Sequence, residues 1–313
     1  MLGQDLAAGS GGSPPLCFRH CANVRRMRRW LPSLLLIALS CGGEAKRPLV
    51  VGSKNFTESV LLGEIVAQQL EGAGCKVERR LNMGGTFVCD TAMTSGALDS
   101  YVEYSGTALT AILKLPISRD SARVDAAVRE QYRRRGLIWG PELGFNNTFA
   151  MIVRRSDAQR LGLRTISDLA KVADRFRPGF GYEFAARPDG WNGLLQAYDL
   201  RFANSPRTMD LGLTYKAVAG GDVDLIAGNS TDGLITPLGL VVLADQRHYF
   251  PPYAAAIVTR ADLDGKCPGA RAALERLAGS FDDAAMRRLN YEVDGKKRDV
   301  ADVAREFLTS VRK

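Results

Sequence analysis

Short apolar strands alternate with helices along the first part of the chain, and this alternation limits the fold more than any other feature of the sequence. Strand patterns are predicted at residues 49–51, 76–81 and 99–103. Helical spacing separates them, and the two helices are expected to end at Gly72 and Gly96. Strands joined in this order through helices form a parallel sheet that the helices cover.

The alternation resumes further along the chain and predicts a second α/β unit between about residues 147 and 249. Asn55 and Glu58 are interpreted as the N-cap and N3 pair of the first helix. The remaining predicted elements are strands at 149–154, 179–183, 223–227 and 254–259, with helices at 167–173, 191–199, 215–219, 268–278, 282–289 and 300–311.

Residues 1–40 are predicted to be a leader rather than part of the fold. They carry five arginines and one aspartate, which is half of the net charge of +8. Residues 27–43 read MRRWLPSLLLIALSCGG, with arginines, a short apolar run and small residues in the order of a secretory signal. Met27 is the expected start, and residues 1–26 are interpreted as an extension of the gene model.

Cys41 follows the apolar run in a pattern that resembles the lipobox of bacterial lipoproteins. The resemblance implies that Cys41 is lipidated and anchors an exported protein, either in the periplasm or at the cell surface, to a membrane. An ordinary signal peptide with an incidental cysteine is the alternative.

The remaining cysteines and histidines exclude several kinds of chemistry. Cys75, Cys89 and Cys267 lie in the exported body, so at most one disulfide forms among them. A pair between Cys75 and Cys89 is one possibility, and a buried Cys89 thiol is the other. Since no cluster has the spacing of metal ligands, we expect no metal and no cofactor. His248 is the sole histidine outside the leader, and it is interpreted as a hinge or surface residue.

The loops that follow the predicted strands are the candidate binding surfaces, because ligands of parallel α/β proteins bind at the carboxyl ends of the strands. These loops are rich in glycine, small hydroxyl residues, asparagine and charge, and they comprise residues 52–55, 82–86, 104–107, 183–190 and 228–232. No basic surface interleaved with aromatic residues accompanies them, so we do not expect nucleic acid as a partner.

Six motifs in and around these loops resemble the substrate-binding lipoproteins of ABC importers for glycine betaine, proline betaine, carnitine and choline. In chain order they are GSKNFTES, GGTFV, YVEYSGTAL, EFAARPDG, STDG and FPPYAAAIV. The resemblance implies an α/β fold of the type II periplasmic-binding-protein class, with ligand held between two lobes. It implies lobes at residues 48–146 plus 250–313 and at 147–249, and it implies an ABC permease and its ATPase as partners.

The resemblance also assigns roles to single residues. Lys54 and Arg187 would bind the carboxylate of a betaine, and Thr107 would add a hydrogen-bond donor. The trimethylammonium group has no N–H, so aromatic faces would bind it through cation–π attraction.

Three aromatic residues, Tyr104, Phe149 and Tyr215, are the expected walls of this cage. A fourth wall is commonly a tyrosine, where this chain has Asn229. Asp232 of the STDG motif completes the expected ligand-binding set.

Asn229 makes the expected cage more polar and more open. Glycine betaine, choline and carnitine are the ligands expected first, and a larger betaine such as ergothioneine is the alternative. Trp191 is a candidate to compensate for the lost ring. An exported hydrolase on a similar fold is a rival hypothesis, and the histidine content argues against it, so we expect no catalytic residue and no enzyme activity.

Overall fold

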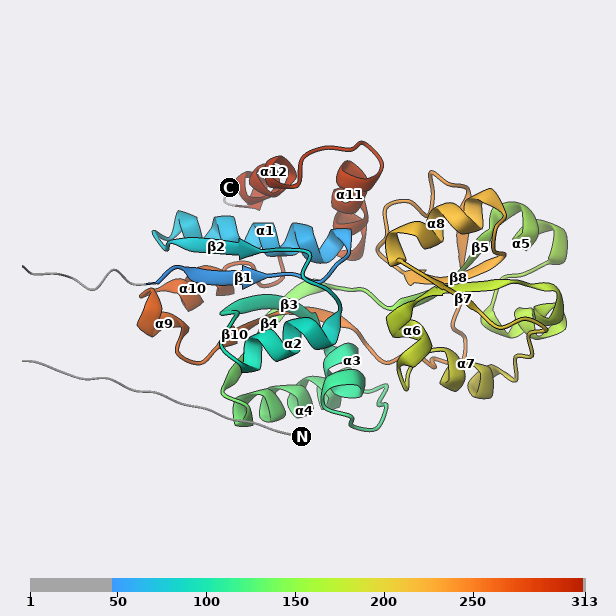
Figure 1. The fold of residues 1–313 in the computed structure, drawn as a ribbon, viewed down its shortest axis with the longest axis horizontal. Helices are drawn as coiled ribbons and strands as arrows, with labels where there is room; N and C mark the ends of the chain where they lie inside the picture. The colour runs from blue at the N-terminus through green and yellow to red at the C-terminus, as the bar shows by residue number, and fades with distance from the viewer. Residues whose placement is uncertain (1–46, 312–313) are drawn as a thin grey trace, which may run out of the picture. The chain divides into compact units, whose positions relative to one another are not determined.

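The computed structural model describes residues 47–311, and within them two mixed sheets are each packed between helices (Figure 1). The first sheet has the strand order β2-β1-β3-β10-β4. β1 pairs in parallel with β2 and β3, whereas β10 is antiparallel to both β3 and β4. The strands are β1 Leu49–Gly52, β2 Val77–Arg80, β3 Ser100–Tyr104, β4 Leu137–Asn146 and β10 Ala254–Arg260.

The second sheet repeats this pattern of neighbours with different strands. Its order is β7-β6-β8-β5-β9, where β6 is parallel to β7 and β8, and β5 is antiparallel to β8 and β9. In each sheet the strand in the fourth spatial position, β10 or β5, is therefore antiparallel to both of its neighbours. The strands are β5 Phe149–Arg154, β6 Pro178–Gly181, β7 Arg207–Met209, β8 Leu225–Asn229 and β9 Leu240–Leu243.

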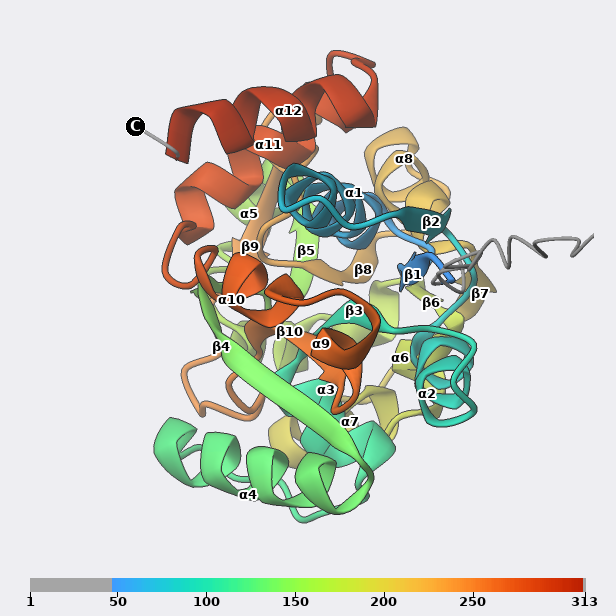
Figure 2. The same cartoon turned by 90° about the vertical axis from the view of Figure 1, so that its left-hand side faces the viewer.

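Helices cover both faces of the first sheet: α1 and α12 lie on one side of it, and α2 and α4 on the other (Figure 2). Within residues 47–311, no helix combines the length and the apolar character that crossing a membrane requires. The α-helices are α1 Thr57–Gly72, α2 Thr86–Thr94, α3 Ser105–Thr107, α4 Ser121–Arg134, α5 Arg155–Leu161, α6 Tyr182–Ala186, α7 Trp191–Tyr198, α8 Leu211–Gly220, α9 Leu263–Lys266, α10 Ala270–Glu275, α11 Asp283–Asp294 and α12 Val300–Val311. The short helices η1, η2 and η3 are Ala108–Ile112, Ile166–Lys171 and Ala173–Arg175.

The parallel β1, β2 and β3 agree with the alternation in the sequence, but α4 and β4 were not predicted. β4 reads LIWGPELGFN. Glycine and proline inside a strand weaken the period-of-two pattern by which strands are recognised. The ladder between β10 and β4 is correspondingly irregular, with register shifts on both sides of Ala256.

The start of α1 also differs from the prediction that Asn55 caps this helix. The N-cap residue is Phe56, and no side chain caps the helix. Glu58 therefore occupies the second helical position, and only 3% of it is exposed. Because its carboxylate accepts bonds from inside the protein rather than from the helix end, Glu58 belongs to the interior.

The possible Cys75–Cys89 pair is wrong, because the two cysteines pack on opposite faces of the first sheet. Cys75 belongs to the core cluster that contains Val102 and α1, whereas Cys89 lies in the cluster that contains Tyr101. Successive residues of a strand point to opposite faces, so the two clusters are separated by the sheet. Cys75 is bonded to Cys267, and Cys89 is a buried free thiol.

The strands divide between the sheets in a way that supports the predicted lobes. All strands of the first sheet come from residues 49–146 and 254–260, and all strands of the second come from residues 149–243. We propose the lobe boundaries 48–146 plus 250–313 and 147–249 on this basis. The two connections between the sheets are then the short segment before β5 and the longer one before β10.

Candidate ligand-binding site

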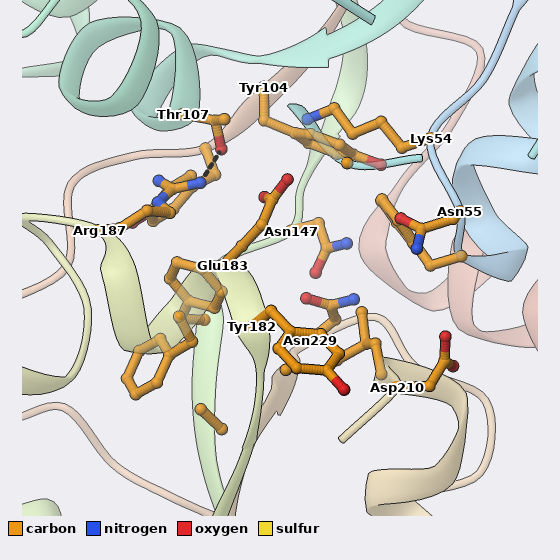
Figure 3. Close-up of a pocket in the computed structure, with 18 residues that line it drawn as sticks. Lys54, Asn55, Tyr104, Thr107, Asn147, Tyr182, Glu183, Arg187, Asp210 and Asn229 are labelled. Atoms are coloured by element: carbon orange, nitrogen blue, oxygen red, sulfur yellow. Dashed lines mark hydrogen bonds between the residues drawn. The ribbon is translucent and has the colours of Figure 1, made fainter. Parts of the chain in front are cut away.

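A cavity of about 240 Å³ is lined by residues from both sheets (Figure 3). Six of its residues are aromatic: Phe56, Tyr104, Phe149, Tyr182, Phe184 and Tyr253. The others are Lys54, Asn55, Gly85, Thr107, Asn147, Gly181, Glu183, Arg187, Asp210, Leu211, Ala227 and Asn229.

The strand directions explain why these residues meet. Tyr104 is the last residue of β3, and it lies beside Ala255 near the start of the antiparallel β10. In the second sheet, Phe149 starts the antiparallel β5 and pairs with Asn229 at the end of β8. The amino end of each antiparallel strand thus lies at the same sheet edge as the carboxyl ends of its parallel neighbours.

Six of the eight predicted ligand-binding residues line this cavity, and the other two do not. The six are Lys54, Tyr104, Thr107, Phe149, Arg187 and Asn229. Tyr215 and Asp232 instead line a neighbouring cavity of about 300 Å³. Trp191, the candidate to replace a lost ring, is buried against Phe180 and Phe202 and does not line the first cavity.

Tyr215 supports the cavity from behind rather than facing it. Its ring packs in the core cluster that contains Ile152 and Ile226, on the side of the second sheet that α8 covers. The backbone N–H of Asn229 donates to the Tyr215 hydroxyl over 2.8 Å. Tyr215 therefore holds the end of β8, and through it Asn229, in place.

Lys54 follows β1, and its charge is matched by a buried carboxylate. Its Nζ donates to Oε1 of Glu103 over 2.5 Å, and the two side chains are 4% and 0% exposed. Burial raises the pKa of Glu103, and the charge of Lys54 opposes that rise. Nζ also lies 5.1 Å from the centre of the Tyr104 ring. One of the three Lys54 donors is thus used on Glu103, and the ring and ammonium are held together.

Arg187 connects the two halves of the molecule, which are the proposed lobe at residues 147–249 and the proposed lobe that contains residues 48–146. It donates to both carboxylate oxygens of Asp189 and to the hydroxyl of Thr110 over 3.3 Å. It also donates to the hydroxyl of Thr107 over 2.9 Å (Figure 3). Burial alone would raise the pKa of Asp189, but the bonds from Arg187 more than offset it, so this pKa lies below its ordinary value. The guanidinium also lies 4.9 Å from the centre of the Phe149 ring. Four of its five N–H groups are used inside the protein.

Glu183 forms a second connection between the halves. Its carboxylate accepts hydrogen bonds from the backbone N–H and the hydroxyl of Thr86, at the first turn of α2. A carboxylate is favoured there because the amino end of a helix presents unpaired N–H groups. Gly85 lies under this carboxylate and has no side chain that would block its approach.

Glu58 is a buried carboxylate that holds Tyr104 in place. Its Oε1 accepts from the Tyr104 hydroxyl over 2.7 Å and from Nδ2 of Asn147 over 2.8 Å. Its Oε2 accepts from the hydroxyl of Thr231 and from Nδ2 of Asn290. Burial raises the pKa of Glu58, and these four bonds oppose the rise. One carboxylate thus joins α1, the end of β3, the segment before β5, the segment after β8 and α11.

The sequence matches a family model along nearly all of the described residues. Residues 47–310 match the substrate-binding domain of the ABC-type glycine betaine transport system. The chain belongs to this family. Its members are substrate-binding components of betaine, carnitine and choline transporters, and the fold is that of periplasmic binding proteins.

Individual relatives agree with the family. The chain is 33% identical over 271 residues to the carnitine transport binding protein OpuCC of Listeria monocytogenes, covering 85% of this chain and 88% of that protein. It is 36% identical over 266 residues to the ergothioneine transport permease/ergothioneine binding protein EgtU of Helicobacter pylori, covering 84% of this chain. The chain spans about half, 47%, of the length of that second relative. A solved glycine betaine/carnitine/choline ABC transporter structure is 31% identical, with a TM-score of 0.70 over 84% of this chain and 98% of that one.

Several residues of the cavity were missed by the family-based prediction. Glu183 begins the predicted strand-end loop 183–190, and Phe56 directly follows the loop 52–55; neither was assigned a role there. Tyr253 was missed because it precedes a strand, and the prediction considered the residues that follow strands. Asn147 was missed for the same reason.

Other predicted features lie outside this site. Cys41, the predicted lipidation site, falls outside the described residues. Among residues 47–311, no group of three or more metal-ligating side chains is arranged to hold a metal ion. His248 is exposed, and its backbone adopts a φ of 50° in the connection between β9 and β10.

Proposed function

We propose that this chain is the extracytoplasmic receptor of an ABC importer and binds a quaternary-ammonium compound in the cavity lined by Tyr104 and Phe149. Glycine betaine, choline, carnitine and a larger betaine such as ergothioneine are the candidate ligands. The observation that carries the proposal is the combination of six aromatic side chains with two lining carboxylates, Glu183 and Asp210, at a cavity whose two cations are already paired with other carboxylates.

The charge balance of the cavity favours a cation. Lys54 and Arg187 are each matched by a buried carboxylate, so these two ion pairs cancel. Glu183 and Asp210 also line the cavity, and the structure gives neither of them a lysine or arginine partner within residues 47–311. A trimethylammonium group gains about 0.5–2 kcal/mol from each aromatic face that it contacts.

The carboxylate of a betaine has candidate donors in the same cavity, beside the Tyr104 and Phe149 rings. Lys54 retains two N–H donors after its bond to Glu103, whereas Arg187 retains one. We therefore assign Lys54 as the main carboxylate donor. Arg187 then acts mostly by holding Thr107 and the two halves of the protein in position.

The remaining roles follow from the family. An ABC permease with its ATPase would receive the ligand, and Cys41 would tether the protein to a membrane outside the cytoplasm. Release of the ligand unchanged is expected, since a receptor of this kind catalyses no reaction. Recovery of intact ligand after prolonged incubation, followed by NMR, checks this.

Isothermal titration calorimetry of residues 47–313 tests the proposal. The ligands are glycine betaine, choline, carnitine and ergothioneine. The uncharged carbon analogue of choline, 3,3-dimethylbutan-1-ol, is the matched control, and we expect it to bind at least about tenfold more weakly than choline because it gains no cation–π attraction. Absence of binding to every quaternary ammonium by the folded protein would refute the proposed ligand class.

A further inference from the structure

Asn147 has an unusual position in the cavity. It lies between β4 and β5, and its backbone N–H donates to the carbonyl of Tyr253 over 3.2 Å. The side chain lines the cavity and is 7% exposed. Figure 3 shows its amide directed towards the amide of Asn229.

The orientation of this amide is determined by Glu58. Nδ2 of Asn147 donates to Oε1 of Glu58 over 2.8 Å, and the Tyr104 hydroxyl donates to the same oxygen. Rotating the amide by half a turn would place Oδ1 against this carboxylate, where two acceptors would repel each other. The amide oxygen of Asn147 therefore points away from Glu58.

This oxygen is buried and has no hydrogen-bond partner within the described residues. The neighbouring groups differ from it, because the Lys54 ammonium, the Arg187 guanidinium and the Tyr104 hydroxyl all make hydrogen bonds inside the protein. A buried acceptor without a donor is destabilising, and a ligand that supplies the donor recovers that free energy on binding. Among the described residues, the cavity thus contains a buried acceptor that the protein itself leaves unpaired.

We propose that the ligand carries an O–H or N–H group that donates to Oδ1 of Asn147, so that betaines with such a donor bind more tightly than those without one. This inference rests on the proposed function. A trimethylammonium group has no N–H, and the ionised carboxylate of glycine betaine has no O–H, so glycine betaine leaves Asn147 unpaired. A hydroxyl group on the ligand, or the N–H of a ring, satisfies it.

Asn229 makes room for such a ligand. Where a tyrosine ring would enclose the cation, this chain has a partly exposed amide at the end of β8. An amide accepts and donates, and so it tolerates a polar group that an aromatic wall would desolvate. The site therefore combines two features. Oδ1 of Asn147 requires a donor from the ligand, and Asn229 tolerates a polar substituent on the ligand.

The test compares ligands that differ only in the donor. The three pairs are carnitine with γ-butyrobetaine, choline with its methyl ether, and ergothioneine with its derivative methylated on both ring nitrogens. We expect the donor-bearing member of at least one pair to bind about tenfold more tightly in calorimetry. Equal affinities within every pair that binds would overturn the inference, while binding itself would leave the proposed function intact. Binding of none of the six compounds would instead count against both.

Asn147→Leu tests the residue, and Asn290→Leu is its matched control. Asn290 also donates from Nδ2 to Glu58 and also has an unpaired Oδ1, but it does not line the first cavity. We expect Asn147→Leu to reduce the preference within the pair to less than about twofold and Asn290→Leu to retain it. A preference that persists in Asn147→Leu contradicts the role of Oδ1. If Asn147→Leu does not fold, the comparison of the ligand pairs with the unmodified protein decides alone.

Discussion

The two sheets have the same pattern of strand neighbours, yet they contribute different walls to the cavity. From the first sheet come Lys54, Tyr104 and Thr107, each at most 4% exposed and hydrogen-bonded inside the protein. The second sheet and its helices contribute Tyr182, which is 67% exposed, and the partly exposed Asn229. The first wall is therefore fixed by buried contacts at these three residues, and the second is open to solvent at Tyr182 and Asn229.

This difference separates two tasks that a binding site performs. A wall held by buried ion pairs keeps its geometry when the ligand changes, and thus suits the part that all betaines share. A wall with exposed side chains and an amide in place of a ring is easier to change and suits discrimination between ligands. We expect substitutions in the first wall to affect binding of every betaine, and those in the second to alter preference.

Arg187 is a buried charged residue of the second wall, and its removal is expected to have the largest effect. Arg187→Leu leaves the fully buried Asp189 without its ion-pair partner, with the Tyr253 hydroxyl as a remaining donor. Breaking a buried ion pair in this way costs about 3–5 kcal/mol in the free energy of unfolding. Urea denaturation measures this loss in the free energy of unfolding. Arg305→Leu is the control, because its ion pair with Asp302 is exposed and contributes under about 1 kcal/mol. Equal losses in the two variants would mean that Arg187 is not an anchor.

Tyr104→Ala and Tyr182→Ala compare the two walls directly. Loss of the buried Tyr104 ring is expected to weaken binding about 30-fold, corresponding to about 2 kcal/mol of cation–π attraction in a desolvated site. Loss of the exposed Tyr182 ring should weaken it less than about fivefold. Calorimetry with the tightest ligand measures both, and circular dichroism checks that each variant is folded. A larger effect for Tyr182 would reverse the assignment of fixed and adaptable walls.

Asp232, behind the second wall, gives the smallest expected effect. Burial raises its pKa to about 7 from an ordinary 3.8, with repulsion from Asp294 and Glu58 adding to the rise. The folded state then binds more protons than the unfolded state between these values, so stability is present at low pH and declines as the pH rises through about 7.

Asp232→Asn removes this dependence while the side chain can still accept from the N–H of Leu234. We expect the variant to gain on the order of 1 kcal/mol over the unmodified protein between pH 5 and pH 6, within the interval where only the unfolded state ionises. Denaturation at the two pH values measures the difference. Parallel pH profiles for the two proteins would show that Asp232 ionises freely in the folded state.

The sequence was sufficient to predict the parallel strands β1, β2, β3, β6 and β8 and the residues that follow them, whereas the short parallel strand β7 was not predicted. Lys54, Tyr104 and Arg187 were found in this way, together with the family motifs. Residues before the antiparallel strands, such as Tyr253, could not be located without knowing that β10 runs against β3. Strand direction is a tertiary property, and a run of apolar residues does not encode it.

The buried polar groups were misread for a related reason. Glu58 has the spacing of a helix cap, and local spacing does not reveal that α1 begins at Thr57 and turns this carboxylate towards Tyr104. Cys75 and Cys267 are 192 residues apart, and only the packing of α1 against α10 and the first sheet brings them together. Both cases depend on contacts between segments distant in the sequence.

A crystal structure with the tightest-binding quaternary ammonium compound tests the central claim most directly. We predict that the quaternary nitrogen lies within about 6 Å of the centres of the Tyr104 and Phe149 rings. The ligand's donor should reach Oδ1 of Asn147. A ligand bound instead in the neighbouring cavity, beside Tyr215 and Asp232, would contradict the account.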